Sequence, residues 1–231
     1  MERIDKVISS QTEYSRKEIK ELIRKKRIKI NEKIVSKADE KVNSEVDIIL
    51  IDDKKIEIKK FVYLILNKPK GYISATEDKE QKTVLDLIST KYLYRKLFPA
   101  GRLDKDTTGL MLITDDGAFT HEILSPKKHV KKVYNVKLDI PVTEEMKNGF
   151  KNGIKLNDGK CKIADLKILN VYECVVTLTE GRYHQIKRMF GCYGAKVVEL
   201  KRIQMGELQL PKDLLEGESR ELTKEELKKI K

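Results

Sequence analysis

The stretch Gly101-Arg-Leu-Asp-Lys-Asp-Thr-Thr-Gly-Leu110 places a charged turn in the middle of an apolar segment. Phe98-Pro-Ala100 leads into the turn, and the apolar run Leu110-Met-Leu-Ile113 leads out of it. Two carboxylates, Asp104 and Asp106, are therefore expected at the edge of a hydrophobic core. Carboxylates in that position either cap a turn or take part in chemistry, and we expect Asp104 to be the chemical group.

The composition limits the class of protein. The 231 residues suffice for one large domain or two smaller ones, and 39% of them are hydrophobic. Lys and Arg number 49 against 37 Asp and Glu, which gives a formal net charge of +12. This surplus favours a polyanionic partner, nucleic acid first, although a lysine-rich surface that maintains solubility explains the charge equally well.

Cysteine usage and the lengths of apolar runs indicate an intracellular protein. Cys161, Cys174 and Cys192 are odd in number and form no CxxC pair, which argues against a disulfide framework and against a zinc site. The N-terminus is charged from Glu2 onward, so no signal peptide is expected. No run approaches the roughly 20 apolar residues that span a bilayer. We therefore expect a soluble, cytoplasmic protein.

Residues 1–52 predict a small basic module. An apolar stripe of helical period in residues 4–8 predicts a first helix. Ser15 and Glu18 form a capping box that starts a second helix. Short strands are expected to follow over residues 28–30 and 46–51, so the module combines helices with a small sheet.

Positive charge is concentrated in the middle of this module. Between Tyr14 and Lys29, eight cations stand against two anions, a local net charge of +6. A charge run on a helix is often only its solvated face, but this concentration also suits a phosphate-binding patch whose affinity falls with salt. The predicted RNA-binding residues are Ser15, Arg16, Lys17, Lys20, Arg24, Lys25, Lys26, Arg27 and Lys29.

The remainder of the chain predicts a larger second domain. Residues 53–60 are charged and weakly patterned, so we expect a tether there, followed by a domain over residues 61–231. Strands are predicted within residues 61–66, 72–76, 110–114, 133–138, 161–178 and 197–210, and short helices within residues 83–88 and 117–124 and after Thr143, Glu180 and Thr223. Many strands with interspersed short helices predict an α+β fold with a mixed or antiparallel sheet.

Two metal-dependent alternatives for the opening turn are unfavourable. Asp104-Lys-Asp106-Thr-Thr108 fits the DxDxT pattern of phosphatases that form an aspartyl phosphate, but Pro99, Gly101 and Arg102 disrupt the strand that this chemistry requires. A calcium loop starting at Asp104 fails because residues 110–113 are apolar where the loop should be polar. The three histidines lack ligand spacing, so we expect no metal site.

Three separated segments resemble the motifs of one family. Gly101-Arg-Leu-Asp-x-x-Thr-x-Gly-Leu110, Lys132-x-Tyr134 and Glu180-Gly-Arg-x-His-Gln-Ile-Lys-Arg-Met189 are similar to those of RNA pseudouridine synthases that carry an N-terminal S4 domain. The resemblance runs over essentially the whole chain. It implies an S4 RNA-binding domain over residues 1–52 and a synthase domain over residues 61–231.

The N-terminal module supports the same resemblance. Arg3-Ile-Asp-Lys6, Ser15-Arg16, Leu22-Ile23 and Arg27-Ile-Lys-Ile-Asn31 resemble the S4 domain, a two-helix unit followed by a small curled sheet. The module departs from the family where glycines are common, because Lys26 precedes the Arg27–Asn31 strand and Glu32 follows it.

Within the family, several details resemble the members that modify small-subunit ribosomal RNA. They are Asp106-Thr-Thr-Gly109, Thr114-Asp-Asp-Gly117, Ser125-Pro126 and Tyr183-His-Gln-Ile-Lys187, with most weight on Tyr183 and Lys187. This implies a uridine of 16S rRNA, in the helix-18 loop, as the target, in a partly assembled small subunit. No metal or cofactor is implied, and a monomer suffices. The alternatives are a 23S rRNA or tRNA synthase and a binding-only S4 ribosome-assembly factor.

The resemblance makes Asp104 the catalytic carboxylate. The reaction of the family cleaves the bond between uridine N1 and the ribose, turns the uracil and rejoins it through C5. Substrate and product are isomers, so no external energy source is needed. One carboxylate can serve as nucleophile or as acid and base, and whether it first attacks the base at C6 or the sugar at C1′ stays open.

The resemblance also assigns roles to the substrate-binding residues. Lys187, with Arg102 as a second candidate, would keep Asp104 ionised. Tyr134 would stack on the extracted uracil and offset part of the few kcal/mol that unstacking costs. Arg182, His184, Gln185 and Arg188 would contact the RNA. Taken one at a time, each of three residues also has a purely structural explanation. Asp104 fits the cap of a turn, Tyr134 fits an aromatic residue of a sheet, and Lys187 fits a solvated surface lysine. Asp106 is expected to hydrogen-bond only within its own turn.

Overall fold

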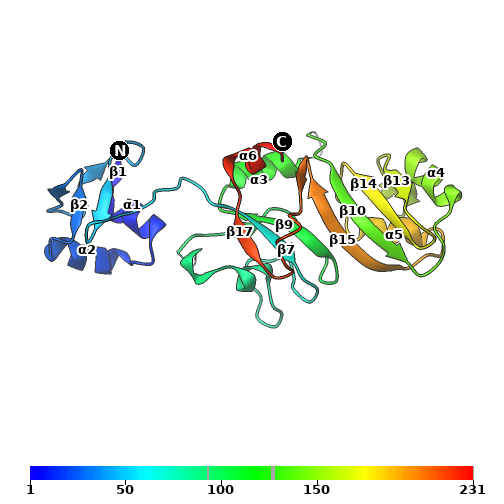
Figure 1. Ribbon diagram of the computed structural model, residues 1–231, viewed down its shortest axis with the longest axis horizontal. Coiled ribbons are helices and arrows are strands. Elements are labelled where there is room, and N and C mark those ends of the chain that lie inside the picture. Colours follow the sequence, from blue (N-terminus) through cyan, green and yellow to red (C-terminus); the bar gives the residue numbers. More distant parts are fainter. Residues whose placement is uncertain (93, 126–127, 231) are drawn as a thin grey trace. The chain divides into compact units, whose positions relative to one another are not determined.

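The chain folds into two compact units in the computed structural model, which describes residues 1–92, 94–125 and 128–230 (Figure 1). The small unit comprises Met1–Val62 and Ser89–Leu97, and the large unit comprises Tyr63–Ile88 and Phe98–Lys231. The Ser125-Pro126 dipeptide of the predicted motifs lies partly outside the described residues.

The small unit has the helix-helix-sheet order predicted for the N-terminal module. Its elements are β1 (Glu2–Arg3), α1 (Ile4–Gln11), α2 (Arg16–Arg24), β2 (Ile28–Ile30), β3 (Lys33–Ile34), β4 (Lys41–Val42), β5 (Ile49–Ile51) and β6 (Lys54–Lys55), with the 3₁₀ turn η2 (Thr90–Tyr92) in its second segment. The strands form a β3-β2-β5-β6 sheet and a separate β1-β4 pair. Ile4, Ile8, Ile19 and Ile28 are fully buried in the core between helices and sheet.

Local signals explain the helix start and the tight turns of this unit. Ser15 accepts a hydrogen bond from the Glu18 backbone while the Glu18 carboxylate accepts from the Ser15 backbone, so the predicted capping box is confirmed. Lys26 and Glu32, which stand where the family commonly has glycine, have φ angles of 55° and 70°. Left-handed backbone is what glycine would supply at lower cost.

The expected tether over residues 53–60 was wrong for most of its length. Lys54–Lys55 pairs with β5 as an edge strand, and Ile56 and Ile58 pack against the core of the small unit. The Lys59 backbone N–H also donates to Gln11 Oε1 at 2.9 Å. These residues belong to the small unit, because their alternate apolar side chains have a core to cover.

The large unit is organised around one mixed sheet, as predicted. Its strand order is β13-β14-β10-β15-β9-β7-β17, with β8 beside β9 and β16 beside β15. The β9–β15 pair is parallel and the other pairs along the sheet are antiparallel. The strands are β7 (Tyr63–Lys68), β8 (Phe98–Pro99), β9 (Thr108–Thr114), β10 (Lys132–Leu138), β13 (Asp165–Ile168), β14 (Glu173–Leu178), β15 (Val197–Met205), β16 (Leu208–Gln209) and β17 (Ser219–Glu221), and the hairpin of β11 (Lys155–Leu156) and β12 (Gly159–Lys160) lies outside the sheet.

Short helices lie at the two ends of this sheet. In Figure 1, α3 (Gly117–Leu124) and α6 (Lys224–Lys228) lie towards the β17 end, whereas α4 (Glu144–Asn152) and α5 (Gln185–Gly191) lie towards the β13 end. The rings of Phe150 on α4 and Phe190 on α5 pack 4.7 Å apart. Thr143 and Thr223 cap α4 and α6, and Thr83 caps the 3₁₀ turn η1 (Val84–Leu87), as the sequence predicts.

One predicted strand is absent. Residues 72–76 form only an isolated bridge between Ile73 and Thr83. The reason is that Ser74 pairs with the charged turn instead of with a strand. Its hydroxyl donates to the Leu103 carbonyl at 2.7 Å and accepts from the Leu103 backbone N–H at 2.9 Å. This segment therefore braces the turn that carries Asp104.

Candidate active site

Asp104 lies in the loop between β8 and β9, directly after the buried Leu103. The loop is held by backbone bonds on both sides: Thr107 N–H donates to Asp104 O at 3.1 Å, and Gly71 N–H donates to Lys105 O at 2.8 Å. The Asp104 side chain is 27% exposed. The carboxylate is thus presented by a structured loop with part of its surface open.

A lysine that the sequence analysis missed supports the same loop from beneath. Lys68, the last residue of β7, is fully buried. Its ammonium group donates to backbone carbonyls, at 3.0 Å from Asp104 O, 3.3 Å from Lys105 O, 2.8 Å from Thr107 O and 3.2 Å from Pro69 O. Burial lowers the pKa of Lys68 to about 8, although Asp106 and Asp104 attract its charge. The sequence feature that could have identified Lys68 is a lysine at the end of an apolar strand, directly before Pro69.

Lys187 joins the site from α5, as the resemblance implies. Its Nζ lies 3.2 Å from Asp104 Oδ2. It also lies 2.5 Å from Asp106 Oδ1, so the expectation that Asp106 bonds only within its own turn was wrong. The hydrogen bond from Thr107 N–H to Asp104 O closes the turn that carries both acids. Asp104 and Asp106 therefore share one cation.

Burial and ion pairing act in opposite directions on this cluster. Burial lowers the pKa of Lys187, but its bonds to Asp106 and Asp104 outweigh burial and leave the pKa above that of a free lysine. Partial burial likewise raises the pKa of Asp106, but the hydrogen bond and the charge of Lys187, with smaller contributions from a backbone hydrogen bond and His184, together hold that pKa below its usual value. Both partners consequently stay charged at neutral pH.

His184, and not Arg102, is the second basic side chain beside Asp104. His184 Nε2 lies 3.5 Å from Asp104 Oδ1, and the residue adopts left-handed backbone with φ 46° at the start of α5. Arg102 is exposed, and within residues 1–92, 94–125 and 128–230 it forms no ion pair with Asp104. The expectation that Arg102 would help to keep Asp104 ionised is thereby corrected.

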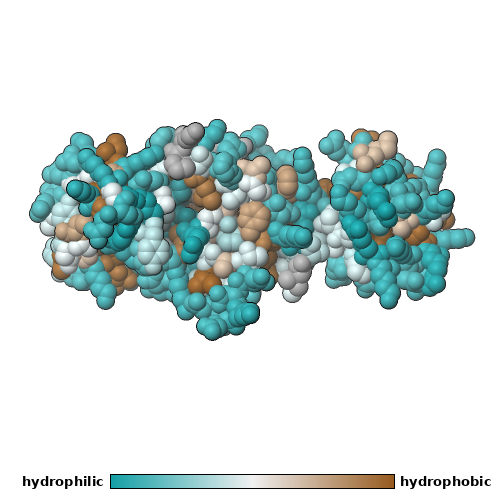
Figure 2. Space-filling model, turned by 180° about the vertical axis from the view of Figure 1, so that it is seen from behind, coloured by the Kyte–Doolittle hydropathy of each residue, from teal (hydrophilic) through white to brown (hydrophobic). Residues whose placement is uncertain are grey.

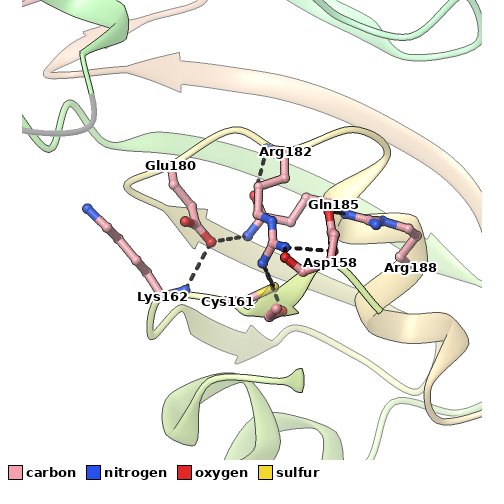
Figure 3. A network of polar contacts seen from close by, with 8 residues as sticks. Asp158, Cys161, Lys162, Glu180, Arg182, Gln185 and Arg188 are labelled. Carbon is pink, nitrogen blue, oxygen red and sulfur yellow. Dashed lines mark hydrogen bonds and ion pairs between the residues drawn. The ribbon is translucent and has the colours of Figure 1, made fainter. Parts of the chain in front are cut away.

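A polar network fixes the turn from which α5 begins (Figure 3). Arg182 binds Asp158 of the β11–β12 hairpin at 2.6 Å and donates to Gly159 O at 3.0 Å. Gln185 donates to Glu180 Oε1 at 2.7 Å and accepts from the Arg182 backbone N–H at 3.0 Å. The network holds the start of α5, the helix from which Lys187 reaches the Asp104 loop.

This network corrects the predicted role of Gln185. It also gives Arg182 and Arg188 a partner inside the protein. Gln185 is 4% exposed and both atoms of its amide are bonded inside the protein, so it positions the turn and does not face RNA. Arg188 also reaches Asp158, at 3.0 Å. Arg182 and Arg188 thus share one carboxylate, and contact of either with RNA remains a prediction.

Tyr134 lies on β10, the strand between β14 and β15. Its backbone registers with Val176 on one side and Arg202 on the other, and its side chain is nearly buried. Lys132, the first residue of the Lys132-x-Tyr134 motif, donates to Val130 O at 3.0 Å. Burial, aided by Arg202, lowers the pKa of Lys132 to about 8. The stacking role of Tyr134 remains a prediction.

The predicted RNA-binding residues of the small unit are mostly exposed. Arg24 pairs with Glu21, Arg27 with Asp52 and Lys29 with Asp53, which lowers their availability to phosphates. The remaining predicted cations make no ion pair in the part of the chain that the structure describes: Arg16, Lys17, Lys20, Lys25 and Lys26. Figure 2 shows that hydrophilic residues cover most of the face in view.

Two further observations concern metal ligands and membrane spans. No three His, Cys, Asp or Glu side chains in the described ranges gather into a group that could hold a metal ion. No described helix is both long and apolar enough to cross a bilayer. The titratable side chains at the Asp104 loop are Asp104 and Asp106 of the loop itself, His184 and Lys187 at α5, and Lys68 of β7.

Comparison with known proteins defines the class. Residues 62–191 match the RNA pseudouridylate synthase family, and residues 2–48 match the S4 domain. The chain therefore belongs to the RNA pseudouridine synthases that carry an N-terminal S4 domain, and it is an isomerase. The match covers β7, the Asp104 loop and α5, the elements that build the site.

Individual relatives span the whole chain. The chain is 44% identical to an uncharacterized RNA pseudouridine synthase of Aquifex aeolicus over 231 residues, 99% of this chain and 96% of the relative. It is 40% identical to ribosomal small subunit pseudouridine synthase A of Escherichia coli over 230 residues, 99% of each chain. A crystal structure of a pseudouridylate synthase matches with a TM-score of 0.70 and 40% identity, covering 100% of both chains.

Proposed function

We propose that this synthase converts one uridine of 16S rRNA, in the loop of helix 18, to pseudouridine. The observation that carries the proposal is full-length similarity, at 40% identity, to a relative named for the small ribosomal subunit. The similarity includes both the small unit and the synthase domain. It therefore extends to the part that would bind the RNA and to the part that would carry out the reaction. The motif residues Tyr183 and Lys187 favour the same branch of the family.

Asp104 is the proposed catalytic carboxylate. Its side chain is partly exposed, lies beside Lys187 and His184, and is held by a loop whose carbonyls Lys68 ties down. Lys187 places a cation 3.2 Å from this carboxylate, and an adjacent cation suits a nucleophile or general base that acts in its charged form. In the reaction the N1–C1′ bond breaks and C5 bonds to C1′. The hydrogen of C5 leaves as a proton to solvent, and N1 takes up a proton, so the product is an isomer of the substrate. Tyr134 stacks on the uracil.

The small unit supplies the cations that are proposed to bind the phosphates of the RNA backbone. Its exposed cations, Arg16, Lys17, Lys20, Lys25 and Lys26, neutralise phosphates near the target. The partner is 16S rRNA in a partly assembled small subunit, bound by a monomer in the cytoplasm. The binding-only alternative loses support, because residues 62–191 match a catalytic family.

A pseudouridine map of ribosomal and transfer RNA tests the target. Carbodiimide treatment marks pseudouridines as stops of reverse transcription, and strains with and without the gene are compared. We expect one 16S stop, in the helix-18 loop, to disappear on deletion and to return with the gene. Loss of a 23S rRNA or tRNA stop, with all 16S stops unchanged, would assign the enzyme to a different RNA.

A further inference from the structure

An exposed tyrosine next to the catalytic loop has no role in the site described so far. Tyr183 is 73% exposed, which makes it the most exposed aromatic side chain within the described ranges. An exposed aromatic ring beside a site that acts on RNA offers a flat face on which a base can stack. Its neighbourhood therefore identifies what it could bind.

The ring of Tyr183 is held in place from one side. It stacks on the ring of His184, with centroids 3.8 Å apart and planes inclined by 17°. His184 in turn lies with Nε2 3.5 Å from Asp104 Oδ1. One imidazole thus separates the tyrosine ring from the catalytic carboxylate. With one face covered and the ring still largely exposed, the other face is open to a ligand.

The backbone contributes to this arrangement. His184 has φ 46°, a left-handed conformation that a non-glycine residue adopts at some cost. The bonds from Arg182 to Asp158 and from Gln185 to Glu180 hold the turn on either side of Tyr183 and His184. The stacked pair is therefore positioned before any RNA arrives, so little entropy is lost when a base stacks on it.

The chemistry of base extraction names the occupant. A uridine that reaches Asp104 has left its stack, and the bases on either side of it each lose a stacking partner. An aromatic ring adjacent to the site can replace that partner, because every base offers a π-face to stacking. We propose that the open face of the Tyr183 ring stacks on the base immediately next to the target uridine.

This inference rests on the proposed function of the Asp104 site and adds a residue that recognises the neighbouring nucleotide. Tyr183 touches RNA and not the reacting atoms, so its effect belongs to binding. An aromatic side chain can stack on any base. The proposal therefore predicts that a base must be present at the neighbouring position, but that any of the four bases will serve.

The test measures binding of a synthetic RNA stem-loop centred on the uridine that the pseudouridine map identifies. The full-length protein is used as wild type, Tyr183→Ala and Tyr183→Phe. Tyr172→Ala is the matched control, since Tyr172 is also an exposed tyrosine, 47% exposed, in the turn before β14. Each protein is titrated with the intact stem-loop and with two copies that carry an abasic residue on the 5′ or the 3′ side of the uridine.

We expect Tyr183→Ala to weaken binding of the intact stem-loop by roughly 5- to 150-fold, the range for loss of one stacked base. Tyr183→Phe and Tyr172→Ala should bind like wild type. One of the two abasic RNAs should bind wild type and Tyr183→Ala equally, which also identifies the side on which the base stacks. KM should rise in Tyr183→Ala while kcat stays close to wild type.

Two results would overturn the proposal: unchanged binding by Tyr183→Ala, or a loss that persists with both abasic RNAs. The second result would place Tyr183 against the target uridine itself. Unequal melting temperatures of the Ala and Phe variants would reveal an effect on folding. A folding effect would weaken binding of the intact and the abasic RNAs alike, so the abasic comparison separates it from a loss of stacking. Failure of the proposed function is recognised separately, because the pseudouridine map would then show no 16S uridine whose modification depends on the gene.

Discussion

Lys187 donates to two carboxylates at once, and this sharing makes Asp104 and Asp106 chemically different. Asp106 is 67% exposed and takes the shorter bond, 2.5 Å, whereas Asp104 is 27% exposed and keeps a 3.2 Å contact together with His184. Asp106 holds the lysine at the shorter distance, and Asp104 remains accessible to a substrate beside that cation. The two acids should therefore respond differently to the same substitution.

Asp104→Asn should abolish pseudouridine formation, a loss of at least roughly 10²-fold, while folding and RNA binding are kept because the amide is isosteric. Asp106→Asn is the matched control. It removes the negative charge that faces Lys187 and leaves the pair with Asp104, so it should lower the rate by a much smaller factor. Turnover, melting temperature and RNA affinity of both variants decide the matter, and equal losses would contradict the distinction.

Lys68 predicts an alkaline limit to activity. With a pKa of about 8, it loses a proton in mildly alkaline solution, and a neutral amine has too few N–H donors for the carbonyls that the ammonium group holds. kcat should fall as the pH rises through about 8. An unchanged kcat up to pH 9.5 would contradict this role.

The sign of the stability effect separates this loss from unfolding. The folded pKa of Lys68 lies below the 10.5 of an unburied lysine, so between these values the unfolded chain binds the extra proton. Proton release at Lys68 therefore favours the folded state as the pH rises from about 8. A melting temperature measured over the same range should show no fall that accompanies the loss of kcat.

At the scale of single residues, short sequence motifs predicted Asp104, Lys187 and their pairing, because these residues lie within the motifs themselves. Lys68 could not be found in this way. Its partners lie 36 to 39 residues away, and a lysine that ends a strand is ordinarily solvated. The second bond of Lys187, to Asp106, also required the folded loop.

Gly109 shows how an element holds the site in register. It lies on β9 with φ 98°, and a Cβ there would collide with the backbone carbonyl of Arg202 on β15. Gly109 and Arg202 are register partners in the one parallel pair along the sheet. The close approach of β9 and β15 also lets Arg202 Nε donate to Leu110 O at 2.7 Å.

Gly109→Ala should therefore lower the free energy of unfolding by at least about 2 kcal/mol, because both the φ angle and the space exclude a side chain. Gly117→Ala is the control, since Gly117 opens α3 with open space around its Cα and alanine is the better helix former. Denaturant unfolding of the two variants gives the comparison. Equal stabilities would show that the β9–β15 contact is not as close as described.

Elements with a clear apolar period were predicted well, and short edge elements were not. The strand predicted within residues 110–114 is β9, which begins two residues earlier, and the region predicted within residues 197–210 forms β15 and β16. The apolar residues Ile186, Met189 and Phe190 of α5 are buried. β17 and the β11–β12 hairpin have two or three residues per strand, too few for a pattern. Residues 54–58 joined the small unit because β5 offers an edge, which no local pattern reveals.

For the whole molecule, the division of labour between the two units predicts how binding depends on salt. A combined Lys17→Gln, Lys20→Gln and Lys25→Gln variant should weaken RNA binding and reduce the slope of log affinity against log salt by about 2 to 3, close to one unit for each phosphate that is no longer neutralised. Turnover of bound RNA should remain near wild type, since these residues lie in the small unit.

The control removes as much charge elsewhere. Lys224, Lys228 and Lys229 are exposed residues at α6 in the large unit, and their replacement by glutamine should leave the salt slope close to wild type. Equal slopes for both triple variants would mean that the cations of α2 are only a solvated face and that overall charge attracts the RNA.

The most direct test of Asp104 as the catalytic carboxylate follows the hydrogen that leaves C5. Unmodified 16S rRNA labelled with tritium at uridine C5, in partly assembled small subunits, is incubated with purified wild-type protein or with Asp104→Asn. We expect wild type to release one tritium per rRNA molecule and Asp104→Asn to release none while still binding the particle. Tritium release by Asp104→Asn at the wild-type rate would contradict the assignment of Asp104 as the catalytic carboxylate.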